Sequence, residues 1–181
     1  MKILVVVDMQ NDFITGSLGT PEARAIVPNV KKKIEEAVEN GDLIVFTRDT
    51  HWSDYLSSQE GRKLPVEHCI EDTDGWQIYE GLIPDNYGFV LIRDKYTFGD
   101  DELPRDLADF AYRFAKNVTE FELVGLCTDI CVVSNALLLK AYFYEGYEIS
   151  VDATCCAGVT PETHEAALKT MEMCQINVRR G

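Results

Sequence analysis

Residues 124–137, VGLCTDICVVSNAL, predict the end of a strand, a tight turn and the beginning of a helix. The run 122–126 is short and mostly apolar, which is typical of a buried parallel strand. From Val132 to Tyr144 apolar residues recur at helical spacing. Cys131 therefore falls in the first turn of the predicted helix, where free backbone N–H groups and the helix dipole favour a thiolate. A lone cysteine here could equally be a small buried side chain.

Strands and helices alternate on both sides of this stretch. Apolar runs predict strands at 2–7, 43–47, 88–92, 122–126 and 148–151, with a short sixth at 176–178. Helical spacing predicts one helix that begins after Pro28 and ends at Gly41, and three further helices at 104–117, 132–144 and 160–173. This alternation predicts an α/β fold with a parallel sheet and helices on both faces, formed by residues 1–181 as a single domain.

Chemistry-bearing residues follow several of the predicted strands. Asp8, Asp49, Lys95 and Cys131 each come after such a strand. In open α/β sheets ligands bind beyond the carboxyl ends of the strands, so we expect these side chains to meet at one edge. Because Asp8 and Lys95 lie at strand ends, we expect their substitution to impair chemistry rather than folding. Residues 50–85 form a long irregular loop, which is usually functional in a compact domain.

Charge and composition exclude several classes of partner. Lys and Arg total 17 against 31 Asp and Glu, a net charge of −14, which repels phosphate backbones and anionic lipids. We therefore expect neither nucleic acid nor membrane partners. The chain has no apolar stretch long enough to span a bilayer, and Asp8 interrupts its N-terminal apolar run. We expect a cytoplasmic protein whose six cysteines are reduced.

A set of motifs in one order along the chain resembles the isochorismatase-like cysteine hydrolases, and within them the nicotinamidases, which also act on pyrazinamide. The motifs are VDMQNDF (7–13), TRDTH (47–51), LPVEHC (64–69), DKYTF (94–98) and GLCTDICV (125–132). The resemblance implies a three-layer fold whose six-stranded, mostly parallel sheet is flanked by helices.

The resemblance also implies a catalytic triad of Asp8, Lys95 and Cys131. Cys131 would attack the amide carbonyl as a thiolate, which the Lys95 charge would favour. Asp8 would take the thiol proton and later protonate the departing ammonia. The backbone N–H groups of Cys127 and Cys131 would form the oxyanion hole, with a cis peptide bond before Cys127.

A metal site is the second feature that the resemblance implies. Asp49, His51 and His68 match the nicotinamidase ligands, and Glu60 is a better candidate for the fourth than Ser57. These N and O donors suit one divalent ion, with zinc favoured and manganese or iron as alternatives. No organic cofactor is expected. The metal would hold the ring nitrogen of the substrate.

Aromatic residues are expected to line the substrate pocket. Phe13 matches one family aromatic, but the tryptophan that several members carry before the metal-binding histidine is missing. Tyr96, Phe98 or Trp52 could supply that face of the pocket, or could be ordinary loop packing. His164, on the last predicted helix, is expected to face solvent.

The function that these residues favour is metal-dependent hydrolysis of nicotinamide to nicotinate and ammonia through a thioester. Alternatives are another cysteine amidase of the family, acting on an N-carbamoyl or ureido compound, and isochorismate hydrolysis. A non-catalytic thiol or metal sensor is a reading of a different class. Asp8 and Lys95 argue against it, because sensing needs neither. Since family members often form dimers or tetramers, we expect a homo-oligomer.

Overall fold

One parallel sheet organises the computed structural model, which describes residues 1–114 and 117–181. The six strands lie in the order β3-β2-β1-β4-β5-β6, and every neighbouring pair is parallel. Their bounds are β1 Lys2–Val7, β2 Leu43–Asp49, β3 Val90–Lys95, β4 Glu120–Leu126, β5 Glu148–Ala157 and β6 Asn177–Arg179. The predicted strands are all present, and the sheet is fully parallel rather than mostly so.

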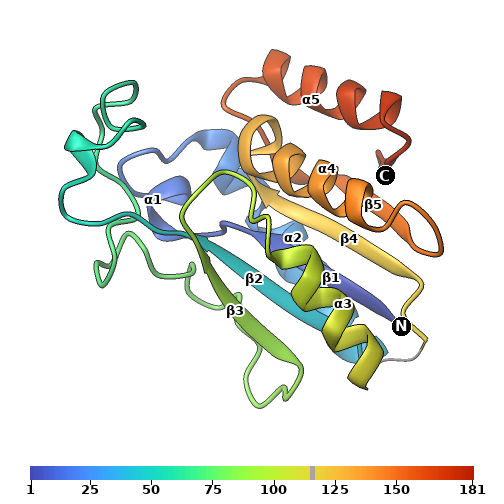
Figure 1. The fold of residues 1–181 in the computed structure, drawn as a ribbon. Helices are drawn as coiled ribbons and strands as arrows, with labels where there is room; N and C mark the ends of the chain where they lie inside the picture. Colours follow the sequence, from blue (N-terminus) through green and yellow to red (C-terminus); the bar gives the residue numbers. More distant parts are fainter. Residues whose placement is uncertain (115–116) are drawn as a thin grey trace.

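Helices cover both faces of this sheet (Figure 1). Helix α2 lies on one face, and α3, α4 and α5 lie on the other. The bounds are α1 Asn11–Ile14, α2 Pro21–Asn40, α3 Leu103–Phe114, α4 Val133–Tyr142 and α5 Pro161–Met173, with a 3₁₀ turn at Tyr55–Ser57 and a π turn at Thr128–Val132. The three-layer α/β prediction is therefore confirmed. Residues 115–116, which the predicted helix 104–117 includes, lie outside the described part.

The central strand β1 shows why the sequence reads as a continuous apolar run. Its alternate side chains enter two separate cores: Ile3, Val5 and Val7 pack with α3, α4 and α5, whereas Leu4 and Val6 pack with α2. A strand covered on both faces has no solvent-facing side, so it needs apolar residues at every position.

The start of α2 differs from the prediction. The helix begins at Pro21, because Thr20 caps it: the Ala23 N–H donates to Thr20 Oγ1 over 3.0 Å, and proline suits the first helical turn. Pro28 therefore lies inside the helix rather than before it. The predicted end is confirmed, since Gly41 takes the left-handed conformation with φ of 70°.

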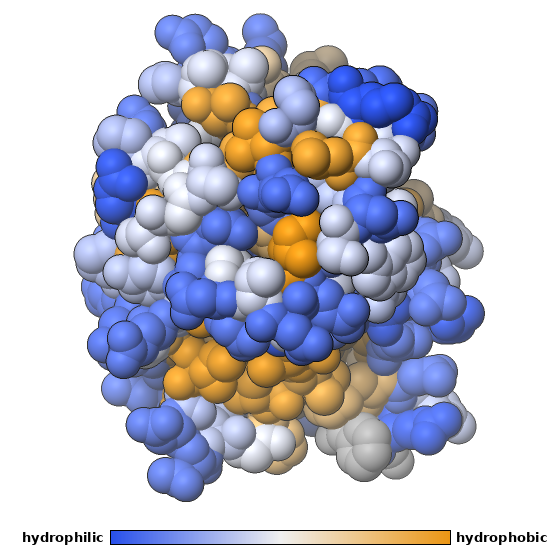
Figure 2. Space-filling model, turned by 90° about the vertical axis from the view of Figure 1, so that its left-hand side faces the viewer, coloured by the Kyte–Doolittle hydropathy of each residue, from blue (hydrophilic) through white to orange (hydrophobic). Residues whose placement is uncertain are grey.

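The outer strand β3 leaves apolar side chains uncovered. Phe89, Leu91 and Ile92 are 45–49% exposed, and β3 is an edge strand. Figure 2 looks onto this side of the molecule and shows a band of apolar side chains at the level of the lower half of β3. Among the described residues no helix has the length and apolar character that crossing a membrane requires.

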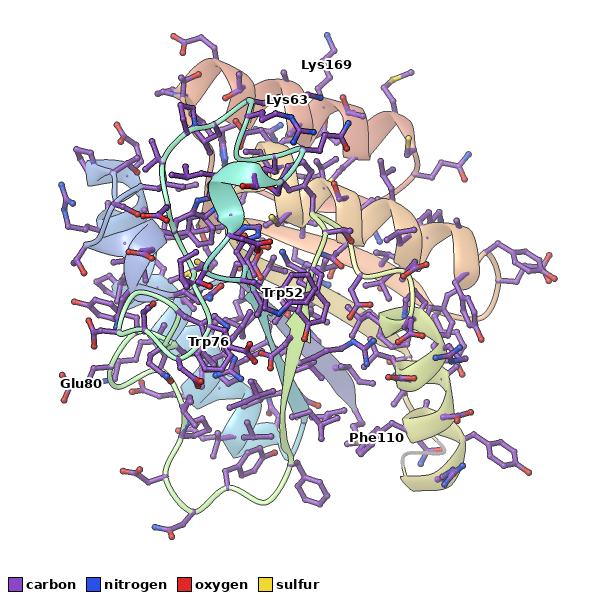
Figure 3. The ribbon with its side chains drawn as sticks, turned by 60° about the vertical axis from the view of Figure 1, so that its left-hand side comes forward. Trp52, Lys63, Trp76, Glu80, Phe110 and Lys169 are labelled. Atoms are coloured by element: carbon purple, nitrogen blue, oxygen red, sulfur yellow. The ribbon has the colours of Figure 1, made fainter. Side chains whose placement is uncertain are left out.

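The irregular segment between β2 and β3 is held by buried polar contacts. Trp76 is 7% exposed; its Nε1–H donates to Thr50 Oγ1 over 2.8 Å, and the Arg48 guanidinium lies 3.5 Å from its ring centre. Trp52, near the start of the segment, is 59% exposed (Figure 3). The contacts of Trp76 with Thr50 and Arg48 fix the path of the segment beside the carboxyl ends of the strands.

Candidate active site

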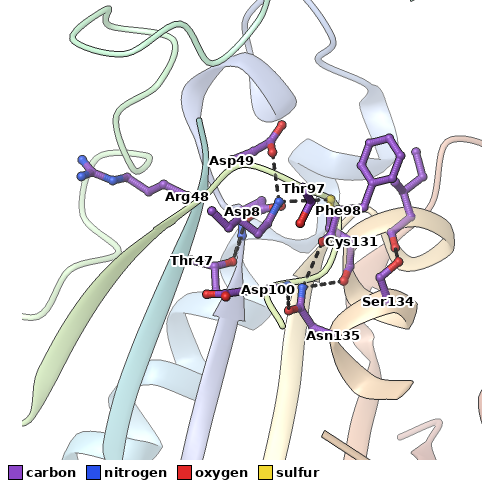
Figure 4. Close-up of polar contacts among 12 residues, drawn as sticks. Asp8, Thr47, Arg48, Asp49, Thr97, Phe98, Asp100, Cys131, Ser134 and Asn135 are labelled. Atoms are coloured by element: carbon purple, nitrogen blue, oxygen red, sulfur yellow. Dashed lines mark hydrogen bonds and ion pairs between the residues drawn. The ribbon is translucent and has the colours of Figure 1, made fainter. Parts of the chain in front are cut away.

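Asp8 is the residue that follows β1, and it is completely buried. It has a positive φ of 48°, and its N–H bonds to the Thr47 carbonyl over 3.2 Å. The Thr47 hydroxyl donates to Asp8 Oδ1 over 2.7 Å (Figure 4). Burial raises the pKa of Asp8, and the nearby ammonium group of Lys95 only partly offsets this. Asp8 is thus a better proton acceptor than an exposed aspartate.

Lys95 ends β3 and connects three functional groups. Its Nζ lies 2.7 Å from Asp8 Oδ2, 3.0 Å from Asp49 Oδ1 and 3.5 Å from Cys131 Sγ. Burial lowers the pKa of Lys95, but its acidic neighbours, Asp8 first, outweigh burial and raise the pKa well above its usual value. The group therefore carries a fixed positive charge between the carboxylates and the thiol. Asp8 and Lys95 are 0% and 2% exposed, so substituting either would also remove a buried charge.

Cys131 lies in the π turn Thr128–Val132, one turn before α4. The Leu126–Cys127 peptide bond before this turn is cis, as expected. Gly125 precedes it with φ of 117°, where an added Cβ would lie only 2.1 Å from the Val7 carbonyl oxygen. Only glycine allows β4 to approach β1 this closely. The sequence therefore places the thiol on a tightly folded corner beside Asp8 and Lys95.

Burial and three charged neighbours determine the pKa of the Cys131 thiol. Burial raises the pKa of the Cys131 thiol; Lys95 lowers it, while Asp8 and Asp49 raise it again, and the pKa ends well above its usual value. This direction favours the thiol over the thiolate, and Asp8 is the adjacent proton acceptor. The arrangement suits transfer of the proton as the sulfur attacks, rather than a preformed anion.

A group of possible metal ligands lies beside this triad. Asp49, His51, Glu60 and His68 each offer one ligand atom, and these atoms all lie within 4.8 Å of one another. The Nε2 atoms of His51 and His68 lie 3.0 and 3.6 Å from Asp49 Oδ2, and both lie 3.6 Å from Glu60 Oε1. The structure thus brings Glu60, the candidate favoured over Ser57, to the three motif residues.

The charges and hydrogen bonds of these four possible ligands favour the binding of a cation. His68 Nδ1–H donates to the Val66 carbonyl over 2.8 Å, which leaves Nε2 facing the group. Burial raises the pKa of Glu60, and Asp49 raises it further, so a positive ion would relieve the repulsion. Asp49 itself is shared with Lys95. Burial raises its pKa, but Lys95, His51 and His68 together outweigh burial and the pKa falls.

Two supporting residues were not predicted. Gln10 is completely buried; its Nε2 donates to the carbonyls of Asp49 and Trp76, and its Oε1 accepts the Asp49 N–H over 2.7 Å. Asn135 donates to the carbonyls of Cys131 and Phe98, over 2.8 and 3.2 Å (Figure 4). In the sequence, Gln10 and Asn135 are marked only as polar residues within the motif 7–13 and just after the motif 125–132.

A cavity of about 720 Å³ connects the thiol, the metal-ligand group and the predicted aromatics. Phe13 lies edge-on to His68, with ring centres 5.6 Å apart. Tyr96 stacks on Trp52 at 5.2 Å, and Tyr96 and Phe98 are 54% and 45% exposed at the cavity wall. The cavity can therefore hold a flat ring between the metal-ligand group and Cys131.

His164 does not face solvent as expected. It is half-buried, and its Nδ1 lies 2.8 Å from the Thr128 hydroxyl in the turn that carries Cys131. Nothing in the local sequence of α5 indicates this contact, because it joins segments that are distant in the chain.

Comparison with known proteins bears on this geometry. A family model described as the isochorismatase domain matches residues 2–180. The chain belongs to the isochorismatase family. This isochorismatase-family chain is 28% identical to a nicotinamidase from Schizosaccharomyces pombe, over 97% of the chain and 91% of that protein.

Solved structures of the family agree with the fold. A pyrazinamidase of Pyrococcus horikoshii in complex with zinc is 30% identical and superposes with a TM-score of 0.81, covering 99% of both chains. An N-carbamoylsarcosine amidase from Thermoplasma acidophilum is 28% identical, with a TM-score of 0.78 over 99% of this chain and 96% of that one. The isochorismatase-family chain is thus a nicotinamidase-like hydrolase that acts on an amide bond.

Proposed function

We propose that this hydrolase converts nicotinamide to nicotinate and ammonia through a thioester on Cys131. The observation that carries the proposal is one cavity lined by Cys131 and by the group Asp49, His51, Glu60 and His68. A thiol supported by Asp8 and Lys95 explains amide cleavage, and a ligand group for a metal explains the choice of a substrate with a ring nitrogen.

The side chains of the triad divide the chemistry. Cys131 Sγ attacks the amide carbonyl while its proton passes to Asp8, and the N–H groups of Cys127 and Cys131 stabilise the oxyanion. Asp8 then gives the proton to the leaving nitrogen, which departs as ammonia. Water attacks the thioester, Asp8 takes a proton from that water, and nicotinic acid leaves as the proton returns to Cys131; the acid then loses its proton to solvent and becomes nicotinate. Lys95 keeps Asp8 ionised between these steps.

The donor set fits a divalent metal ion. Two imidazoles and two carboxylates are hard or borderline ligands suited to zinc, and also to manganese or iron. We propose zinc, which the Pyrococcus horikoshii relative contains. When bound, the ion would hold the pyridine nitrogen, and Phe13, with Tyr96 and Phe98, would line the faces of the ring.

The test compares two amides with and without chelator. We expect kcat/KM for nicotinamide to fall at least tenfold on chelation, mainly through KM. Benzamide lacks the ring nitrogen, so it should be a poor substrate that chelation changes little. Equal losses for both amides would show that the metal serves the reaction or the fold, and unchanged nicotinamide turnover in metal-free enzyme would contradict the ligand assignment.

A second candidate is an amidase for N-carbamoyl compounds, favoured by the Thermoplasma acidophilum neighbour. N-Carbamoylsarcosine has no ring to stack and no pyridine nitrogen, so its hydrolysis should not depend on Phe13 or on the metal. Turnover of this compound above that of nicotinamide, retained in His51→Ala, would favour the second candidate.

We also propose that the enzyme is a cytoplasmic homo-oligomer. All six cysteines are free, which suits a reducing compartment. The apolar band around Leu91 and Ile92 on the edge strand is a candidate contact between copies (Figure 2). Light scattering after gel filtration should give a multiple of the chain mass, and Leu91→Glu should reduce it. A monomer mass for the unaltered protein would contradict this proposal.

A further inference from the structure

The π turn Thr128–Val132 is attached to α5 by a partly buried hydrogen bond. Thr128 is the first residue of the turn and is 0% exposed. Its hydroxyl lies 2.8 Å from Nδ1 of His164, on α5. A buried hydroxyl almost always has a partner, and here that partner comes from a different layer of the fold. The contact therefore fixes the turn relative to a helix rather than only to its own strand.

A second contact joins the same two parts of the molecule. The Val159 N–H, in the corner between β5 and α5, donates to the Asp129 carboxylate over 3.1 and 3.2 Å. At Gly158 an added Cβ would lie 2.9 Å from the His164 Cβ, so the backbone of α5 at His164 is packed closely against the corner. Gly158 and Val159 also line the substrate cavity. The turn is thus hydrogen-bonded both to His164 of α5 and to Val159 in the corner that precedes α5.

The first turn of α5, which carries His164, is fixed by its own capping hydrogen bonds. Thr160 and Thr163 form a capping box at the start of α5, with the Thr163 N–H donating to Thr160 Oγ1 over 3.2 Å. His164 follows directly after this box. Its ring is not among the groups that line the cavity, so it does not reach a bound substrate. The His164 ring would therefore act on the reaction through its neighbours, and its hydrogen-bond partner among them is the Thr128 hydroxyl.

We propose that His164 is a positioning residue: through the Thr128 hydroxyl it holds the turn that carries Cys131 and lies between the two oxyanion donors. The inference rests on the proposed amidase function of Cys131. The N–H groups of Cys127 and Cys131 flank Thr128 in sequence, so a shift of Thr128 changes their spacing. A misplacement of about 1 Å at such donors can slow a reaction about 100-fold. Burial lowers the pKa of His164, so the ring is neutral at pH 7 and the hydrogen bond is uncharged.

The test uses matched pairs of variants. His164→Leu and Thr128→Val keep the packing but remove the hydrogen bond. His164→Asn keeps a polar atom near the place of Nδ1, and Thr128→Ser keeps the hydroxyl. Lys169→Leu changes an exposed residue of the same helix and is the control (Figure 3).

We expect His164→Leu and Thr128→Val each to lower kcat for nicotinamide between 10- and 100-fold, with KM changed less than threefold. The double variant should be no slower than the worse single one, because both remove the same contact. His164→Asn and Thr128→Ser should recover most of kcat. A purely structural role predicts instead that Asn fails as Leu does, or that kcat and KM change together, and either result would overturn the proposal.

A second measurement separates this inference from the proposed function. Backbone hydrogen exchange over residues 126–133 should be faster in His164→Leu than in the unaltered protein and should return to its rate in His164→Asn. If the enzyme hydrolyses nicotinamide but neither kcat nor exchange responds to His164→Leu, the positioning role alone is wrong. If no amide is hydrolysed, the proposed function fails, and unchanged exchange would then overturn the positioning role as well.

Discussion

At the scale of single residues, the fixed charge of Lys95 has the largest consequences. Its ammonium group lies within 3.0 Å of both Asp8 and Asp49, and all three side chains are buried. Lys95→Met keeps most of the volume but leaves two carboxylates without a cation. Breaking a buried ion pair costs about 3–5 kcal/mol. We expect a loss of that order in the free energy of unfolding at pH 7, measured by urea with chelator present, together with loss of activity.

The exposed Lys169 supplies the control, since Lys169→Met should change the free energy of unfolding by less than about 0.5 kcal/mol. The loss in Lys95→Met should shrink at pH 5, where protonation neutralises Asp8 more readily. A variant that is inactive but fully stable at pH 7 would contradict this result and would support the prediction from the sequence that Asp8 and Lys95 serve chemistry rather than folding.

The raised pKa of Asp8 predicts the acid side of the pH profile. Burial raises this pKa above 3.8, and in the proposed mechanism the carboxylate form accepts the Cys131 proton. Activity should therefore fall as the pH drops through the raised pKa, at a higher pH than an ordinary aspartate would give. The measurement is kcat/KM against pH at saturating metal, with metal content checked at each pH. Constant kcat/KM down to pH 4 would exclude Asp8 as the base.

The meeting of the proposed catalytic residues could be predicted from the sequence, whereas the hydrogen bonds that support them could not. Asp8, Lys95 and Cys131 each follow a strand, so the rule for parallel sheets places them at one edge. Thr47 and Gln10 act through hydrogen bonds across 39 positions of the chain, which depend on the register between β1 and β2. His164 escaped detection for the same reason. Hydrogen-bond partners of this kind are fixed by packing, and local patterns do not contain them.

At the scale of secondary structure, α2 shows how a local rule can mislead. Proline usually marks a helix start, yet Pro28 lies inside α2. The helix is capped earlier, at Thr20, and its buried face, which includes Ile26, Val30 and Ile34, extends on both sides of Pro28. Periodicity therefore gave the buried face and the end of the helix, but the wrong start. Strand positions were predicted more reliably, although β5 runs to Ala157, beyond the predicted end at residue 151.

Pro28 should consequently be a site of stabilisation. It lacks the N–H that would bond to the carbonyl of Arg24, and it is exposed, so its replacement loses no burial. Pro28→Ala should raise the free energy of unfolding by about 1–3 kcal/mol, with the urea m-value unchanged. Glu35→Ala, at another exposed position of α2, is the matched control and should be nearly neutral. A destabilised Pro28→Ala protein would mean that the ring supports the native helix.

At the scale of the whole molecule, the parallel sheet assembles a site from segments that are far apart in the chain. The order β3-β2-β1-β4 places the ends of four neighbouring strands together, and these ends supply Lys95, Asp49, Asp8 and the Cys131 turn. Alternating strands and helices were enough to predict a parallel sheet with these residues at one edge, but not the order of its strands. The path of residues 50–89 was not predictable, since it depends on buried contacts such as Trp76 with Thr50.

Metal binding should stabilise the fold as a whole, because the ligand group joins separate parts of that irregular segment. Asp49 and His51 lie at and just after the end of β2, Glu60 follows the 3₁₀ turn, and His68 lies in the next loop. An ion that binds only the folded chain, at 100 times its dissociation constant, adds about 2.7 kcal/mol to the free energy of unfolding. We expect zinc added to chelated protein to raise Tm, and His68→Ala to abolish this increase. Glu67→Ala, at an exposed neighbouring position, should retain it.

Because a Tm measurement needs no substrate, the result does not depend on which amide the enzyme hydrolyses. An equal zinc-induced rise in Tm in the unaltered protein and in His68→Ala would place the ion elsewhere. No rise in either protein would mean that the ligand group holds no zinc.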